Sequence, residues 1–181
     1  MFQPEKSFCF IFPFGKLLLL LMKNRSALLS SRIRDQFLSG KWIANTNFAD
    51  QLQNTNIKAA TTKFGKLNTI AALTFHVNYY IQGLNDFFQN GKLDIHDKFS
   101  FDMPVINTDN DWSSLKNALL KNAELFAILI GNLTNEQLDS VFVLEKYGTV
   151  ERNIEAMIEH GYYHLGQISL LNKMIENPVS R

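Results

Sequence analysis

Two histidines near the end of the chain have a spacing suited to holding a metal ion. His160 and His164 are four residues apart within the apolar segment 150–176. If this segment is helical, both rings lie on one face, with Cβ atoms about 5–6 Å apart. Both can then reach one ion at the roughly 2.0–2.1 Å of a zinc–nitrogen bond. A helix already holds the pair in place, so little entropy is lost when the ion binds.

A third histidine, His76, has the same setting in the segment 67–88. It belongs to an apolar series at helical spacing formed by Leu73, His76, Tyr80, Leu84 and Phe87. A single inward histidine is usually a hydrogen-bonded core residue, but three inward histidines on two helices favour a shared ligand. Burying imidazoles without partners is costly. One divalent cation satisfies all three and leaves a fourth coordination position for water or substrate.

Three neighbours of the histidines are candidates for binding a cofactor or substrate beside the ion. Gln167 is one turn after His164 and is expected to orient a ligand or a bound water, or to hydrogen-bond a neighbouring helix. Tyr80, one turn after His76, is expected to donate its phenol proton to a bound group, or to be a core aromatic whose hydroxyl reaches solvent. Tyr163 is expected to line the same pocket.

Other polar residues near the site have two interpretations each. Glu155 and Glu159 are outer acceptors for an imidazole N–H or surface charges. His96, in the segment 92–110, covers the pocket mouth or is a surface histidine. Gly161 in mid-helix costs roughly 1 kcal/mol against alanine, which indicates the close approach of another helix.

The elements that must position these residues are helices. Long helices are expected at 24–38, 67–88, 111–130 and 150–176, the third capped by Asp111. Each is followed by a helix-stop pair, namely Ser39-Gly40, Asn90-Gly91, Gly131-Asn132 and Asn177-Pro178.

The connections contain shorter elements. The pair Thr46-Asn47 is expected to cap a short turn that ends near Leu52, and Asn56 is expected to start another that ends at Gly65. Residues 134–137 have capping-box spacing, and residues 141–146 are expected to be extended. Trp42 and Trp112 are expected to anchor the packing of the helices that they adjoin.

Four long helices with modest connections predict an all-α protein with a four-helix bundle as its architecture. The segment 92–110 between the second and third helices is long enough for a crossover. Periodicity alone leaves the topology open.

At the histidines the sequence resembles a known family. Residues 160–168, HGYYHLGQI, resemble the closing-helix signature H-x-x-Y-H-x-G-Q-I of the DinB/YfiT-like superfamily. Residues 68–76, NTIAALTFH, resemble that family's second-helix segment with its single histidine. The resemblance extends from about Met22 to Ile175.

The resemblance implies a four-helix bundle with up-up-down-down topology and a homodimer. It also implies one divalent ion, usually zinc or nickel, held by three histidines that correspond by position to His76, His160 and His164. Family members include thiol-dependent S-transferases and a maleylpyruvate isomerase. A small-molecule substrate is therefore expected.

A three-histidine ion with an open position can support two reactions. It can activate water for hydrolysis, or it can deprotonate a thiol for attack on an electrophile. Cys9 is the only cysteine and lies outside the expected core, so the thiol would come from a low-molecular-weight cofactor. Thiol transfer is the preferred hypothesis. The alternative is a non-catalytic bundle in which the metal ties the helices together.

The composition excludes further classes of protein. The formal net charge of +1 provides no field to gather nucleic acid or anionic lipid. A single cysteine excludes an internal disulfide framework, and a cytoplasmic location is expected. Residues 22–177 are expected to form one domain.

Residues 1–21 are interpreted as a hydrophobic extension. The apolar stretch, from Ser7 to Met22, is interrupted by Pro13, Gly15 and Lys16 and is shorter than the roughly 18–20 uninterrupted apolar residues of a membrane span. Residues 1–21 are read either as a mis-assigned start, with translation beginning at Met22, or as an ordinary extension, with a signal-like segment as the minority alternative.

Overall fold

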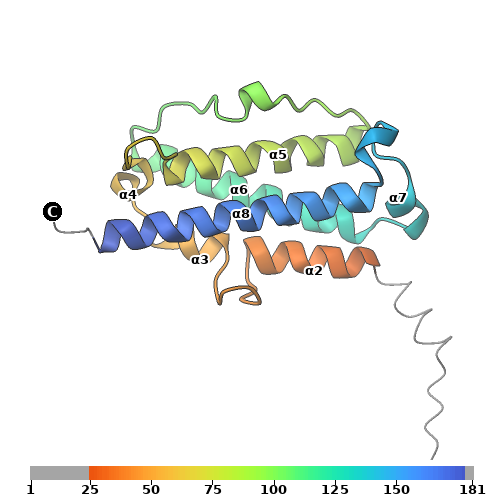
Figure 1. Cartoon of the computed structure of the whole chain (residues 1–181), viewed down its shortest axis with the longest axis horizontal. Coiled ribbons are helices and arrows are strands. Elements are labelled where there is room, and N and C mark those ends of the chain that lie inside the picture. Colours follow the sequence, from red (N-terminus) through yellow and green to blue (C-terminus); the bar gives the residue numbers. More distant parts are fainter. Residues whose placement is uncertain (1–24, 178–181) are drawn as a thin grey trace, which may run out of the picture.

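The structure, a computed structural model, describes residues 25–177, and this part of the chain is all-α. Its long helices lie side by side (Figure 1) and are α2 (Arg25–Phe37), α5 (Ile70–Asn90), α6 (Asp109–Gly131) and α8 (Val150–Glu176). All four were expected, with bounds shifted by up to three residues. The hydrophobic segment 1–21 lies outside the described residues.

Short elements join the long helices. Three are α-helices, namely α3 (Phe48–Gln53), α4 (Ile57–Thr61) and α7 (Asn135–Asp139). Two are single 3₁₀ turns, η1 (Asp97–Phe99) and η2 (Glu145–Tyr147). The segment 141–146, expected to be extended, forms only one isolated bridge, between Val141 and Thr149, before it enters η2.

Polar side chains that cap the helices determine where they begin. Asn47 and Asn56 cap α3 and α4, as expected, although α4 ends at Thr61 rather than Gly65. The expectation that Asp111 caps α6 was wrong. Thr108 is the N-cap, and Asp111 is the third residue of the helix, where its carboxylate completes a capping box with Thr108.

Helices α2 and α8 run in the same direction. Arg25, at the start of α2, pairs with Glu151 at the start of α8, and the Gln36 amide near the end of α2 donates to the Ile158 carbonyl at 2.7 Å. Helices α5 and α8 run in opposite directions, because His76 contacts His164 while the later Tyr80 contacts the earlier His160.

Helices α5 and α6 also share a direction. The Asn122 amide donates to Asn78 at 2.9 Å, and further along both helices Phe88 lies against Phe126. The helices therefore follow the order up, down, down, up, and the expected up-up-down-down order is wrong. The compact α3–α4 connection returns the chain antiparallel to α2, whereas residues 91–108 run back along the length of α5 (Figure 1). We call residues 91–108 the strap.

The core lies between the four long helices and includes several fully enclosed aromatic side chains. Trp112, Phe37, Phe48 and Phe126 are buried, and the Trp112 indole donates to the Thr55 carbonyl at 2.6 Å. The expectation that Trp112 anchors packing is therefore confirmed.

The same expectation was wrong for Trp42, which is 85% exposed. It lies on the connection from α2 to α3, where Ala44 and Asn45 adopt left-handed backbone conformations. The connection between α2 and α3 extends away from the helices (Figure 1), which is consistent with the exposure of Trp42.

Two close approaches bring neighbouring segments against α5 and α8. A Cβ on Gly161 would lie 2.8 Å from the Gln36 amide, so this glycine lets α2 pack tightly on α8, as expected. A Cβ on Gly83 would lie 2.5 Å from Ile95, so Gly83 lets the strap lie directly on α5. Among the helices of residues 25–177, none has the length and apolarity needed to cross a membrane.

Candidate metal centre

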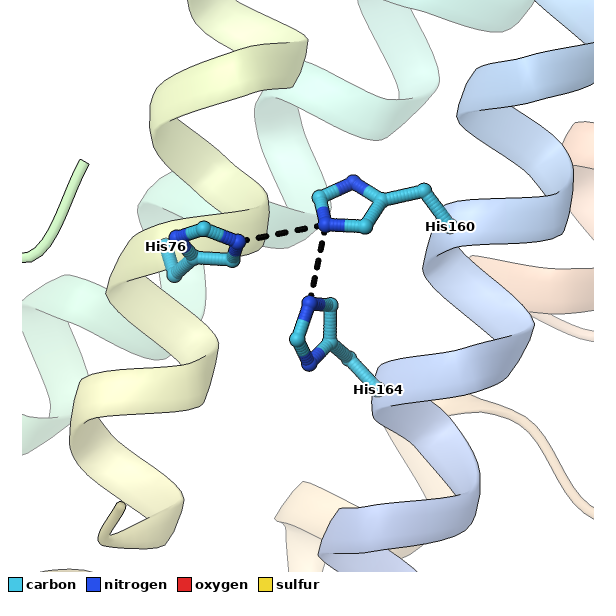
Figure 2. A group of neighbouring side chains, drawn as sticks. All are labelled: His76, His160 and His164. Atoms are coloured by element: carbon cyan, nitrogen blue, oxygen red, sulfur yellow. Dashed lines mark hydrogen bonds between the residues drawn. The ribbon is translucent and has the colours of Figure 1, made fainter. Parts of the chain in front are cut away.

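The three predicted histidines meet between α5 and α8. Figure 2 shows His76 on α5 facing His160 and His164 on α8. The Nε2 atom of His160 lies 3.1 Å from Nε2 of His76 and 2.8 Å from Nε2 of His164. One nitrogen from each ring falls within 4.8 Å of the other two. The convergence expected from helical spacing is therefore present.

Carbonyl oxygens hold two of the rings by their outer nitrogens. His164 Nδ1 is 2.7 Å from the Gln167 side-chain oxygen, and His76 Nδ1 is 3.3 Å from the Ser100 main-chain oxygen. A carbonyl oxygen only accepts, so each Nδ1 carries the hydrogen and donates it. The Nε2 lone pairs of both rings then point at His160.

These hydrogen bonds leave too few N–H donors for the contacts between the three Nε2 atoms. His160 Nε2 carries at most one hydrogen in the neutral ring, so it can donate to His76 or to His164 but not to both. One of the two close nitrogen–nitrogen contacts therefore has lone pairs facing each other. A shared cation satisfies all three lone pairs together.

The electrostatic setting keeps the rings neutral, which is the form that binds metals. Burial, reinforced by neighbouring His164 and His76, lowers the pKa of His160 from 6.5 to about 4. Burial also lowers the pKa of His76, with a further contribution from His164, and burial lowers that of His164 against the opposing Gln167 hydrogen bond.

Two of the three nitrogen–nitrogen separations fit a tetrahedral ion, and the third, between His76 and His164, lies within 4.8 Å. Nitrogen ligands at 2.0–2.1 Å from zinc lie about 3.3 Å from one another. The separations of 3.1 and 2.8 Å are close to that edge length. With three imidazole nitrogens and no sulfur, this group of described residues offers a donor set that suits several divalent metals, zinc, copper, iron and nickel among them.

The strap supplies the remaining walls of the centre. Phe101 stacks on His76, with ring centroids 4.1 Å apart and planes 15° apart. The Tyr80 hydroxyl donates to Asp97 at 2.9 Å, and its ring edge lies near both His76 and His160. Ser100, Phe101 and Asp97 were not predicted from the sequence, because an irregular segment has no periodicity to show which residues face inward.

A cavity of about 720 Å³ opens beside His160. Its lining comes from α5, α8, the strap and the connection into α8, and consists of Tyr80, Leu84, Leu93, Ile95, His96, Asp97, Lys98, Phe142, Tyr147, Asn153, Ala156, Met157 and His160. His160 is thus the histidine that faces both the other two rings and a space large enough for a small molecule.

The structure places the other candidate residues in three different settings. Tyr80 lines the cavity. Gln167 lies behind His164, where it orients the ring and lines a separate space of about 310 Å³. Tyr163 is 65% exposed, lies nearly perpendicular to the His164 ring with centroids 4.9 Å apart, and does not line the cavity.

Three charged or titratable candidates lie at the surface. His96 lines the cavity mouth but is largely exposed, and it lies 3.2 Å from Asp94. Glu155 faces Arg32, and Glu159 pairs with Arg152. Of the two interpretations, the structure favours surface charges for these two glutamates over outer acceptors for an imidazole N–H.

Comparisons with protein-family models, with curated proteins and with solved structures return no match for this chain.

Proposed function

We propose that this chain is a metal-dependent protein of DinB/YfiT-like type that holds one zinc or nickel ion with His76, His160 and His164. The observation that carries the proposal is the convergence of three Nε2 atoms, two of them fixed as acceptors by carbonyl oxygens on the opposite side of the ring. The four long helices serve as the four-helix bundle that holds them, and the proposal includes assembly as a homodimer.

The proposed activity is attack of a deprotonated small thiol, or of water, on an electrophilic small molecule. A bound divalent ion supplies Lewis acidity, which favours the deprotonated form of such a nucleophile. Thiol transfer remains the preferred version, with the thiol provided by a low-molecular-weight cofactor.

Residues of this chain would orient the reactants. Tyr80 is placed to hold a proton at the cavity wall, because its hydroxyl already donates to Asp97. Burial and the Asp97 hydrogen bond raise the pKa of Tyr80, so it stays protonated near neutral pH, and its hydroxyl would donate to a reactant when it leaves Asp97.

The cavity favours a catalytic ion over a purely structural one. A structural ion is enclosed by protein ligands, whereas a catalytic ion keeps one position open. Here His160 lines a cavity of about 720 Å³. Within residues 25–177, the group of potential ligands at this point consists of the three histidines.

The test is metal content after purification and after incubation with zinc or nickel, measured by elemental analysis. We expect one ion per wild-type chain and loss of that ion in His160→Ala. His96→Ala is the matched control, because it removes a largely exposed histidine outside the cluster and should keep the ion. A wild type that takes up neither metal would overturn the proposal.

A further inference from the structure

The cavity beside His160 extends along α5 and α8, away from the histidines. Along α5, Tyr80 and Leu84 follow His76 at one-turn intervals, and along α8, Met157 and Asn153 precede His160 by one and two turns. Because α5 and α8 are antiparallel, both series lead away from the histidines toward the same end of the molecule. The seven residues from His160 to Asn153 correspond to about 10 Å along the helix.

The walls near the histidines are polar. Tyr80 lies beside His160, and its hydroxyl bonds Asp97. The neighbouring strap residues His96 and Lys98 also line the cavity. This end can therefore accommodate a polar group.

The walls further along are apolar. Leu84, Met157 and Phe142 are nearly fully buried, and Phe142 packs against Phe87 with ring centroids 4.8 Å apart. Leu93, Ile95 and Ala156 complete this part of the lining.

The amide hydrogens of Asn153, at the far end, are already bonded within the protein. The Asn153 amide donates to the main-chain oxygens of Tyr147 and Thr149, both at 2.8 Å. This end therefore offers apolar surface and no unpaired amide hydrogen to a ligand.

From this arrangement we propose that the cavity binds an elongated amphipathic small molecule with an oxygen-bearing head at the histidines and an unbranched apolar tail of about eight carbon atoms along α5 and α8. The position of the head rests on the proposed metal function, but the position of the tail depends only on the cavity walls.

The first test is a chain-length series. Straight-chain acyl hydroxamates from acetohydroxamate to decanohydroxamate are titrated calorimetrically into the zinc-loaded protein. Each methylene should raise affinity about fourfold, the equivalent of about 0.8 kcal/mol, until the tail reaches roughly eight carbons and the gain stops. Affinity that is independent of chain length would overturn the proposal.

A second series separates this proposal from the metal proposal. Straight-chain alcohols are titrated into metal-free protein, where the head has no ion to bind. The same dependence on tail length should remain, since the apolar walls do not include the metal. If zinc binds but neither series depends on length, only the amphipathic-ligand proposal fails; if zinc does not bind and the alcohols still show the dependence, only the metal proposal fails.

A variant pair localises the tail. Ala156→Phe should fill the cavity and weaken octanohydroxamate binding by about tenfold or more, while acetohydroxamate affinity and zinc content stay unchanged. Ala27→Phe, on an exposed position of α2, is the control and should leave both hydroxamates unaffected. Equal behaviour of the two variants toward octanohydroxamate would overturn the proposed tail position.

Discussion

Gln167 acts on the centre through the far nitrogen of His164. Its side-chain oxygen accepts the Nδ1 hydrogen at 2.7 Å, which fixes the tautomer that leaves Nε2 free to bind a metal. Gln167→Leu removes this acceptor, and we expect zinc affinity to fall by about 10- to 100-fold. Competition with a chromophoric chelator measures the change.

The control for that change is Gln53→Leu, at an exposed position at the end of α3. It should leave zinc affinity unaltered. Equal affinity in wild type and Gln167→Leu would show that the hydrogen bond does not tune the centre.

The lowered pKa of His160 predicts the acid sensitivity of the metal-free protein. The unfolded chain takes up a proton near pH 6.5, whereas the folded protein resists protonation of this ring until about pH 4. The unfolded state therefore binds more protons in this window, and stability falls as the pH drops from 6.5 to 4. His76 and His164 add to the effect in the same direction.

Thermal unfolding of metal-free protein between pH 7.5 and 4 measures this dependence. His160→Gln cannot titrate, so its melting temperature should fall less steeply over the same range. Identical slopes for the two proteins would contradict the assignment of the lowered pKa to His160.

Apolar periodicity predicted that the three histidines face inward, because the burial of a helical residue and the helix face on which it lies both follow from the local sequence. Tyr163 shows the limit of that reasoning. It immediately precedes His164, so it lies about 100° around the helix, and it is exposed beside the face that carries the histidines. Residues of the strap were not predictable, because their positions depend on contacts with α5.

At the scale of elements, the contact of Gly83 with Ile95 determines how closely the strap lies on α5. Gly83→Ala would place a methyl group 2.5 Å from an Ile95 carbon. We expect a loss of about 1–3 kcal/mol in the free energy of unfolding and weaker zinc binding, since the strap holds Ser100 and Phe101 against His76. Urea unfolding and zinc competition measure the two effects.

Gly166→Ala on α8 is the matched control, because a Cβ there has no atom within 4 Å. It should stabilise the protein by up to about 1 kcal/mol through helix propensity alone. If both variants were stabilising to the same extent, the strap could not be held as closely as the structure shows.

The elements themselves were largely predictable. Thr134 and Asn56 begin helices as expected, and the long helices follow their apolar periodicity. The order of helix directions was not predictable, because a segment of the strap's length can join either parallel or antiparallel neighbours. Only the contacts of α6 with α5 decide between them.

For the whole molecule, an ion at the three histidines would join α5 in the middle of the sequence to α8, the last helix of the described residues. His76 and His160 are 84 positions apart in sequence. A ligand that binds only the folded state stabilises it by about 2.7 kcal/mol at a concentration of 100 times its dissociation constant. For a chain of this size that corresponds to a rise in melting temperature of roughly 5–10 °C.

Differential scanning calorimetry with zinc and with a chelator measures this rise. The double variant His76→Ala/His160→Ala should show no zinc-dependent shift. A shift of equal size in that variant would place the stabilising ion elsewhere.

The four-residue interval between His160 and His164 gives the ion a further property. If α8 slid past α5 by one turn, about 5.4 Å, only one of its two imidazoles would still face His76, and an apolar neighbour would take the other's place. The ion would then lose a ligand. The ion therefore binds fully in only one register of the two helices. It selects that register over alignments of α5 and α8 shifted by one turn, which apolar packing alone could also accept.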